Sequence, residues 1–82
     1  MSEFTARFSR EVGQAIKSLA DPGKADLQAA VRQACADPYS WPQADKYELD
    51  ETVRVISTPT AIVHYVIIPG MNPHLWIFAI TF

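Results

Sequence analysis

Charged residues are missing from the C-terminal third of this 82-residue chain: no Asp, Glu, Lys or Arg follows Arg54. A tail this apolar does not stand alone in water, so we expect it to bury at least one face. Two prolines and a glycine interrupt its centre at Pro69, Gly70 and Pro73, whereas a membrane helix needs about 20 unbroken apolar residues. The tail is therefore predicted to form a β-sheet and not a transmembrane segment.

Cysteine is nearly absent too, and the single Cys35 excludes an internal disulfide. A single cysteine is typical of a protein in a reducing compartment. The N-terminus lacks the charged segment followed by an apolar run that is typical of a signal peptide. We therefore expect a cytoplasmic protein. Cys35 has no histidine near it in the sequence and is interpreted as a packing residue.

The composition argues against several kinds of site. The 7 basic residues are scattered along the sequence, and the formal net charge is −2. A nucleic-acid binder usually carries a basic patch that neutralises phosphates, so this charge distribution argues against that class of protein. His64 and His74 form no ligand pattern with another His or Cys, so no metal is expected. No glycine-rich phosphate loop occurs, so no cofactor is expected. A hydrophobic content of 49% is high for a small domain and indicates a partner surface.

Three stretches rich in β-branched and aromatic residues predict strands at about Glu51–Ser57, Ala61–Ile68 and His74–Phe82. Turn residues at 58–60 and 69–73 separate them. In the second and third strands both alternating sets of side chains are apolar. Such strands are central in a sheet, or their second face meets a partner.

The N-terminal half predicts two helices. Phe8, Val12, Ala15, Ile16 and Leu19 repeat at helical spacing, so a helix is expected at about residues 5–20 with Thr5 as its N-cap. Residues 21–23 end it, and a second helix runs from Lys24 to about Ala36. The predicted fold is α+β, a single domain over residues 1–82. Two antiparallel N-terminal helices pack on one face of a three- to four-stranded antiparallel sheet, and the other face is open and apolar.

Several residues admit two interpretations each. Arg54 could bind phosphate with its planar guanidinium, or pair with Glu51 or Glu48 in an acidic turn. His64 is expected in the core or an interface, and His74, after a turn, could donate a proton. Tyr39 and Trp41 either cover the end of the core or form a base-stacking platform.

The order of these elements resembles the RelE/ParE superfamily of small bacterial toxins from type II toxin–antitoxin pairs. The resemblance spans nearly the whole chain. It is carried by Phe4-Thr5-Ala6-Arg7-Phe8 at the start, Ala36-Asp37-Pro38 after the second helix, and the strand segments 53–56, 62–66 and 75–79. It implies a toxin that inhibits translation by cleaving mRNA on the ribosome and is held inactive by a partner antitoxin. Another branch of the family acts on gyrase.

The resemblance also implies a site. Arg54 matches a basic position of the family, and Tyr65 and His74 are the candidates to assist it, so the implied catalytic residues are Arg54, Tyr65 and His74. Other basic positions of the family fall on Ala61 and Thr81. On this alignment the open face carries Arg54, Val63, Tyr65, Ile77 and Ala79. Because that floor is largely apolar, the alternative is a toxin-fold protein without nuclease activity that binds an antitoxin-like peptide, or itself as a homodimer.

Overall fold

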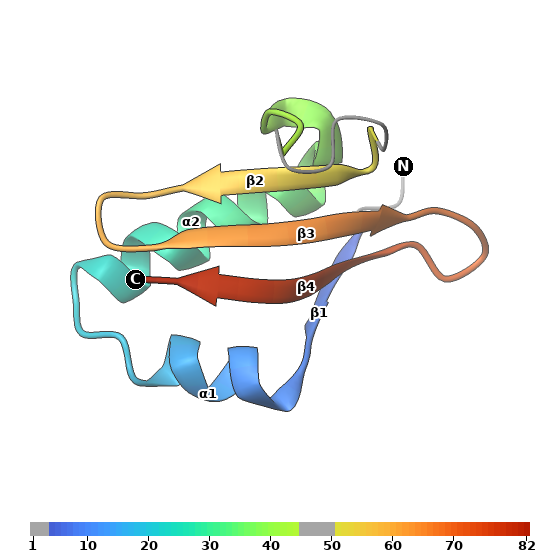
Figure 1. Ribbon diagram of the computed structural model, residues 1–82. Helices are drawn as coiled ribbons and strands as arrows, with labels where there is room; N and C mark the ends of the chain where they lie inside the picture. The colour runs from blue at the N-terminus through green and yellow to red at the C-terminus, as the bar shows by residue number, and fades with distance from the viewer. Residues whose placement is uncertain (1–3, 45–50) are drawn as a thin grey trace.

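The structure is a computed structural model that describes residues 4–44 and 51–82. These residues form four strands, two α-helices and one 3-10 helix (Figure 1). In chain order they are β1 (Thr5–Phe8), α1 (Arg10–Lys17), α2 (Gly23–Ala36), η1 (Pro38–Ser40), β2 (Val53–Ser57), β3 (Ile62–Ile68) and β4 (His74–Thr81). The α+β class predicted from the sequence is confirmed.

The sheet has the strand order β1-β4-β3-β2. Strands β2, β3 and β4 form the antiparallel meander that the sequence predicts. Strand β1, however, pairs in parallel with β4, from Thr5 opposite His74 to Phe8 opposite Ile77. The sheet is therefore mixed, and the prediction of a fully antiparallel sheet is wrong.

The residues predicted as the first helical turn belong to strand β1. Helix α1 starts later, at Arg10, with Ser9 as its N-cap: the Ser9 hydroxyl accepts a hydrogen bond from the Val12 N–H at 3.2 Å. Thr5 therefore caps no helix. The reason is a partner distant in the sequence: strand β4 pairs with residues 5–8 through backbone hydrogen bonds. This tertiary pairing outweighs the local helical spacing.

Helix α2 agrees with its predicted range to within one residue at the start. It begins at Gly23, where the chain passes close to the turn between β2 and β3. A Cβ at this position would lie 2.6 Å from the Thr60 hydroxyl oxygen. The helix ends before Asp37, whose extended backbone (φ −145°) leads into Pro38. The short sequence signals at both ends thus place this helix correctly.

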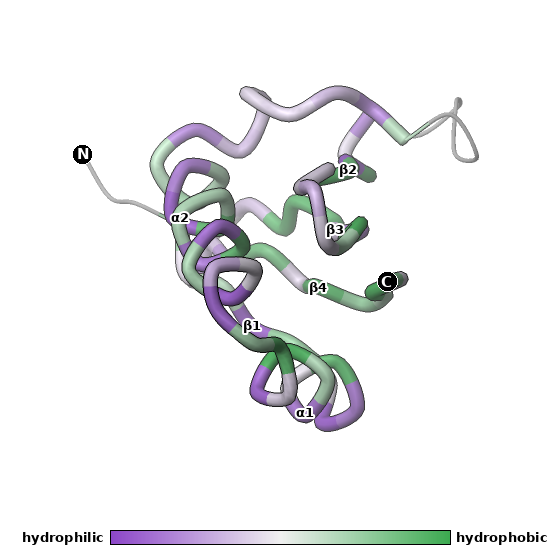
Figure 2. Tube along the Cα trace, turned by 90° about the vertical axis from the view of Figure 1, so that its left-hand side faces the viewer, coloured by the Kyte–Doolittle hydropathy of each residue, from purple (hydrophilic) through white to green (hydrophobic). Residues whose placement is uncertain are grey.

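The helices do not pack against each other as the predicted antiparallel pair. Helix α1 contacts β4 chiefly, whereas α2 contacts β1 and η1. In Figure 2 the strands are seen nearly end-on, with α2 on one side of the sheet and α1 near the β1–β4 edge. Within residues 4–44 and 51–82, no helix covers the opposite face. The open sheet face that the sequence predicts is therefore present.

The core lies between α2 and the sheet. Its buried members are Val12, Leu27, Ala30, Ala34, Ile56, Val63, Tyr65, Ile67, Leu75 and Ile77. The prediction that Val63, Tyr65 and Ile77 lie on the open face is therefore wrong, since each is at most 1% exposed. Both alternating sets of these strands are apolar, so the alternation alone could not decide which set faces the helices.

Candidate interaction surface

The face of the sheet away from α2, here called the open face, carries the other alternating set. On β2, β3 and β4 its members are Val53, Val55, Ser57, Ile62, His64, Val66, Ile68, His74, Trp76, Phe78, Ala79 and Thr81. Several are large apolar side chains with much of their surface in water: Ile62 is 43% exposed and Trp76 is 37% exposed. None of these members is Asp, Glu, Lys or Arg; at the β1 edge of the face, Arg7 lies opposite Trp76 in the ladder. Figure 1 looks directly onto this face.

An irregularity in the ladder between β3 and β4 shapes the open face. The register shifts between His64, opposite Ala79, and Tyr65, opposite Ile77, so β4 has one extra residue. Phe78 is that residue, and its ring lies 6.2 Å from the imidazole of His64. The bulge also brings Ala79 onto the open face, where the sequence placed it. Bulges of this kind re-aim side chains at functional surfaces.

A hollow of about 470 Å³ lies at the β2 side of the open face. The segment 42–44 forms its wall because it runs along the outer edge of β2. The Ala44 N–H donates to the Val53 carbonyl and the Val55 N–H to the Pro42 carbonyl, both at 3.0 Å. The hollow is lined by Pro42, Gln43, Ala44, Val55, Ser57, Ile62 and His64. It combines an apolar floor with three side chains able to form hydrogen bonds.

Arg54, the first predicted site residue, lies on the helix side of the sheet, opposite Tyr65 in the ladder. Its Nε donates to the Glu51 carbonyl at 2.8 Å and another guanidinium N–H donates to the Trp41 carbonyl at 3.2 Å. The guanidinium carbon also lies 4.8 Å from the centre of the Tyr39 ring. Arg54 thus contacts the backbone of Glu51; its other predicted partner, Glu48, lies outside the described residues.

Tyr65, the second predicted site residue, is fully buried beneath the connector. Its hydroxyl donates a hydrogen bond of 2.6 Å to the Pro38 carbonyl. Burial raises the pKa of Tyr65 to about 12, despite an opposing effect from the Arg54 charge. A phenol that is inaccessible and this weakly acidic is held as a neutral hydrogen-bond donor. Tyr65 therefore has a structural role: its ring packs in the core and its hydroxyl satisfies the Pro38 carbonyl.

His74, the third predicted site residue, is half-buried at the first position of β4. Its Nδ1 lies 2.9 Å from the Asn72 carbonyl. His74 is opposite Ile68 in the ladder, and Ile68 is on the open face. His74 is thus on the other face from Arg54 and Tyr65, and about 10 Å further along the strands at 3.3 Å per residue. The structure brings Arg54 and Tyr65 together and leaves His74 apart from both.

The aromatic connector separates into two parts. Trp41 packs against the core and its indole N–H donates to the Ala30 carbonyl at 3.3 Å, so Trp41 covers the end of the core as expected. Tyr39 is 53% exposed and serves instead as the platform for Arg54. Cys35 is half-buried against the core, in agreement with its interpretation as a packing residue.

The sequence identified the apolar character of the open face but not its members. His64, interpreted as a core or interface residue, lines the hollow, and Trp76 and Phe78 lie beside it on β4. The register shift that groups these rings has no signal in the local pattern, because β4 is an unbroken apolar run. A bulge can be located there only once the partner strand is known.

Residues 4–44 and 51–82 contain no cluster of three or more His, Cys, Asp or Glu side chains able to hold a metal ion. Within the same residues, neither helix is long and apolar enough to cross a membrane. Comparisons of the chain with models of known protein families, with curated proteins and with solved structures found no match.

Proposed function

We propose that this protein is a toxin-type domain of the RelE/ParE kind that acts by binding a partner polypeptide through its open face, without cleaving RNA. The observation that carries the proposal is the open face itself. It exposes Ile62 and Trp76 and has a preformed hollow at its β2 side, and its members on β2, β3 and β4 include no Asp, Glu, Lys or Arg. Apolar patches of this kind mark interaction sites.

The positions of the candidate catalytic residues favour binding over RNA cleavage. Attack by a 2′-hydroxyl on a phosphate needs a base, an acid and cations around one point. Tyr65 is buried with a pKa of about 12, and His74 is on the other face from Arg54. Arg54 already donates to two backbone carbonyls. Ribosome-dependent mRNA cleavage, with Arg54 holding the phosphate, stays a prediction that one experiment separates from binding.

The size and charge of the open face indicate the kind of partner. Strands β2, β3 and β4 have 5, 7 and 8 residues. At about 3.3 Å per residue and about 4.8 Å between strands they span a flat area of roughly 320 Å². A stable pair of globular proteins buries about 800 Å² on each partner. The face alone is therefore too small for a stable homodimer. It suits an apolar segment of a partner chain that continues beyond the face, which in the resemblance is the antitoxin.

Induced expression in a bacterial host tests the proposal, with growth followed and mRNA ends mapped by primer extension. We compare the natural chain with Trp76→Asp on the open face and Arg54→Ala on the helix side. Met71→Asp is the matched control, because Met71 lies fully exposed in the turn before β4. We expect intact messages throughout and an effect on growth that Trp76→Asp removes and Met71→Asp does not.

New cuts inside translated messages would contradict binding as the mode of action. If Arg54→Ala abolished those cuts, Arg54 would be assigned to the phosphate and the ribonuclease prediction would stand. A growth effect that Arg54→Ala removes while Trp76→Asp leaves it intact would also place the active surface on the helix side.

A further inference from the structure

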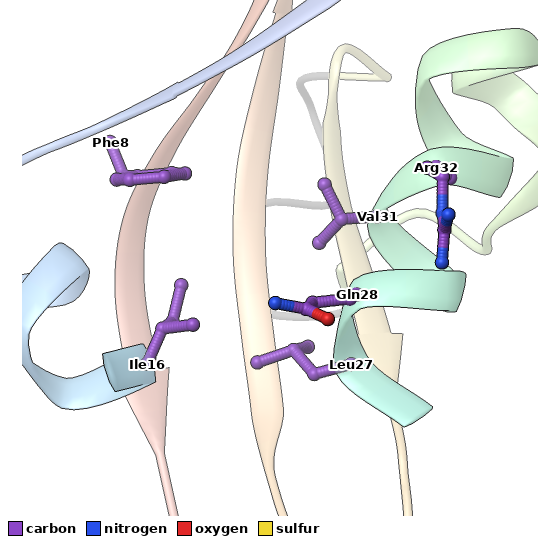
Figure 3. Close-up of a pocket in the computed structure, with 6 residues that line it drawn as sticks. All are labelled: Phe8, Ile16, Leu27, Gln28, Val31 and Arg32. Atoms are coloured by element: carbon purple, nitrogen blue, oxygen red, sulfur yellow. The ribbon is translucent and has the colours of Figure 1, made fainter. Parts of the chain in front are cut away.

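On the helix side, a groove of about 360 Å³ separates the two helices that the sequence predicts to be packed together. Figure 3 shows its walls: Phe8 and Ile16 lie on one side, and Leu27, Gln28 and Val31 of α2 lie on the other. Arg32 completes the lining. The groove is at the lower end of the size range of ligand sites. It is distinct from the open face, because these residues lie on the other side of the sheet.

The wall formed by Phe8 is built into the fold. Phe8 is the last residue of β1, and its ring lies against the backbone of α1 at Gly13. A Cβ at Gly13 would be 3.3 Å from the nearest carbon of that ring, so glycine allows this close approach. Phe8 nevertheless remains 45% exposed and is one of the residues that line the groove. A large aromatic side chain that is fixed on one side and exposed on the other is suited to contact an apolar partner.

The charged side chain among the residues that line the groove is basic: it is Arg32. Lys24, Gln28 and Arg32 are spaced four residues apart and therefore share one face of α2. Asp26 is two residues from both Lys24 and Gln28, so it lies off that face.

None of the six lining residues is acidic. The other acids of the helical segment are Glu11, in the first turn of α1, and Asp21, in the turn between the helices.

We propose that this groove binds an acidic amphipathic helix of a partner polypeptide. Apolar side chains repeating at steps of three and four would contact Phe8, Ile16 and Val31, as in known helix-in-groove recognition. Carboxylates flanking that stripe would face Lys24 and Arg32. Charge complementarity of this kind sets orientation and rejects partners of the wrong sign. The proposal adds a second surface, on the other side of the sheet, to the largely apolar open face of the proposed function.

The test uses two synthetic amphipathic helices of about 18 residues, long enough to span about 27 Å. Both carry the same leucine stripe; one has Glu at every flanking position and the other has Lys. Binding to the full chain is measured by titration calorimetry. The bound site is mapped by amide chemical shifts. We expect the Glu peptide to bind at least tenfold more tightly than the Lys peptide at low salt, with shifts at Phe8, Ile16 and Val31.

Charge reversal provides the decisive variants, since exposed side chains can be changed without removing the core. Lys24→Glu and Arg32→Glu should each weaken the Glu peptide roughly two- to fivefold, and the double variant should prefer the Lys peptide. Trp76→Asp, on the open face, should leave the affinity unchanged. Circular dichroism confirms that each variant is folded.

Equal affinity for the two peptides would overturn the inference, as would shifts centred on Trp76 in place of Val31. An unchanged preference in the double charge-reversal variant would do the same. None of these results bears on the open face, whose role is decided separately by the expression experiment.

Discussion

Tyr65 illustrates how burial decides the role of a single residue. The resemblance to the toxin family makes Tyr65 a candidate to assist catalysis. In the structure its hydroxyl satisfies the Pro38 carbonyl at 2.6 Å, in a core where water does not reach it. If a buried carbonyl loses its hydrogen-bond donor, the free energy spent on removing it from water is no longer offset, and the folded state is destabilised. The same contact ties strand β3 to the connector that carries Tyr39 and Trp41.

Tyr65→Phe is expected to lower the free energy of unfolding by about 1–3 kcal/mol, because it leaves the Pro38 carbonyl without this donor. Urea denaturation of the purified chain measures the change. Tyr39→Phe is the matched control: its hydroxyl lies on a side chain that is 53% exposed. That control is expected to change stability by less than about 0.5 kcal/mol. Equal effects of the two changes would contradict the structural role of the Tyr65 hydroxyl.

The pH dependence of stability, compared between the natural chain and Tyr65→Phe, distinguishes this hydrogen-bonding role from a packing effect. The pKa of Tyr65 is raised from 10.0 to about 12 in the folded state, so the neutral form is favoured there. The stability that this provides is complete below pH 10 and is lost as the pH rises from 10 to 12. A shift of this size corresponds to about 2–3 kcal/mol. The natural chain should therefore lose more stability over this range than Tyr65→Phe does.

Among the elements, strand β1 has the largest consequence for the surfaces. It is only four residues long, yet it joins the beginning of the chain to its last strand. Its end carries Phe8 into the groove, and the turn at Ser9 then starts α1 beside β4. If residues 5–8 were the first turn of a longer helix, Phe8 would not lie at the end of a strand. The groove therefore depends on this pairing.

The turn between β3 and β4 makes a separate prediction. Gly70 has a φ of +123°, a conformation that L side chains rarely adopt, and no atom lies within 4 Å of the position of an added Cβ. Gly70→Ala should therefore cost about 1–3 kcal/mol through backbone strain alone. The neighbouring change Met71→Ala, at a fully exposed side chain, should have almost no effect. Thermal unfolding compares the two, and a neutral Gly70→Ala would exclude strain at this turn.

For the whole molecule, the main feature is the separation of two surfaces with different chemistry. On β2, β3 and β4 the open face includes no Asp, Glu, Lys or Arg, and Arg7 lies at its β1 edge, whereas the groove between α1 and α2 is lined by the basic Arg32. The sheet lies between them, so a change on one surface need not alter the other. A single partner chain could contact both only by passing around an edge of the sheet.

The open face should bind an apolar fluorescent dye when no partner is present. Trp76→Asp places a charge in the middle of this surface and is expected to reduce dye fluorescence at least about twofold, because charge is depleted at apolar contact surfaces. Stability should change little, since the Trp76 side chain is 37% exposed. Met71→Asp, away from the face, should leave the dye signal as it is. Undiminished fluorescence in Trp76→Asp would show that the dye reports another surface.

The sequence by itself determined the elements whose signals are local. The strands predicted at 51–57, 61–68 and 74–82 are observed as β2, β3 and β4, and the second helix agrees closely with α2. Runs of β-branched residues bounded by Pro and Gly specify strands through short-range sterics. The absence of charge after Arg54 was likewise enough to predict an apolar sheet face open to a partner.

Tertiary structure alone decided the rest. Residues 5–8 become a strand because β4, some seventy positions later in the sequence, provides their partner. The helices cover Val63, Tyr65 and Ile77 and leave His64 and Trp76 open, a choice that two equally apolar sets of side chains could not reveal. Pairing and burial depend on residues distant in the chain. The members of the open face and the groove between the helices are therefore set only when the chain has folded.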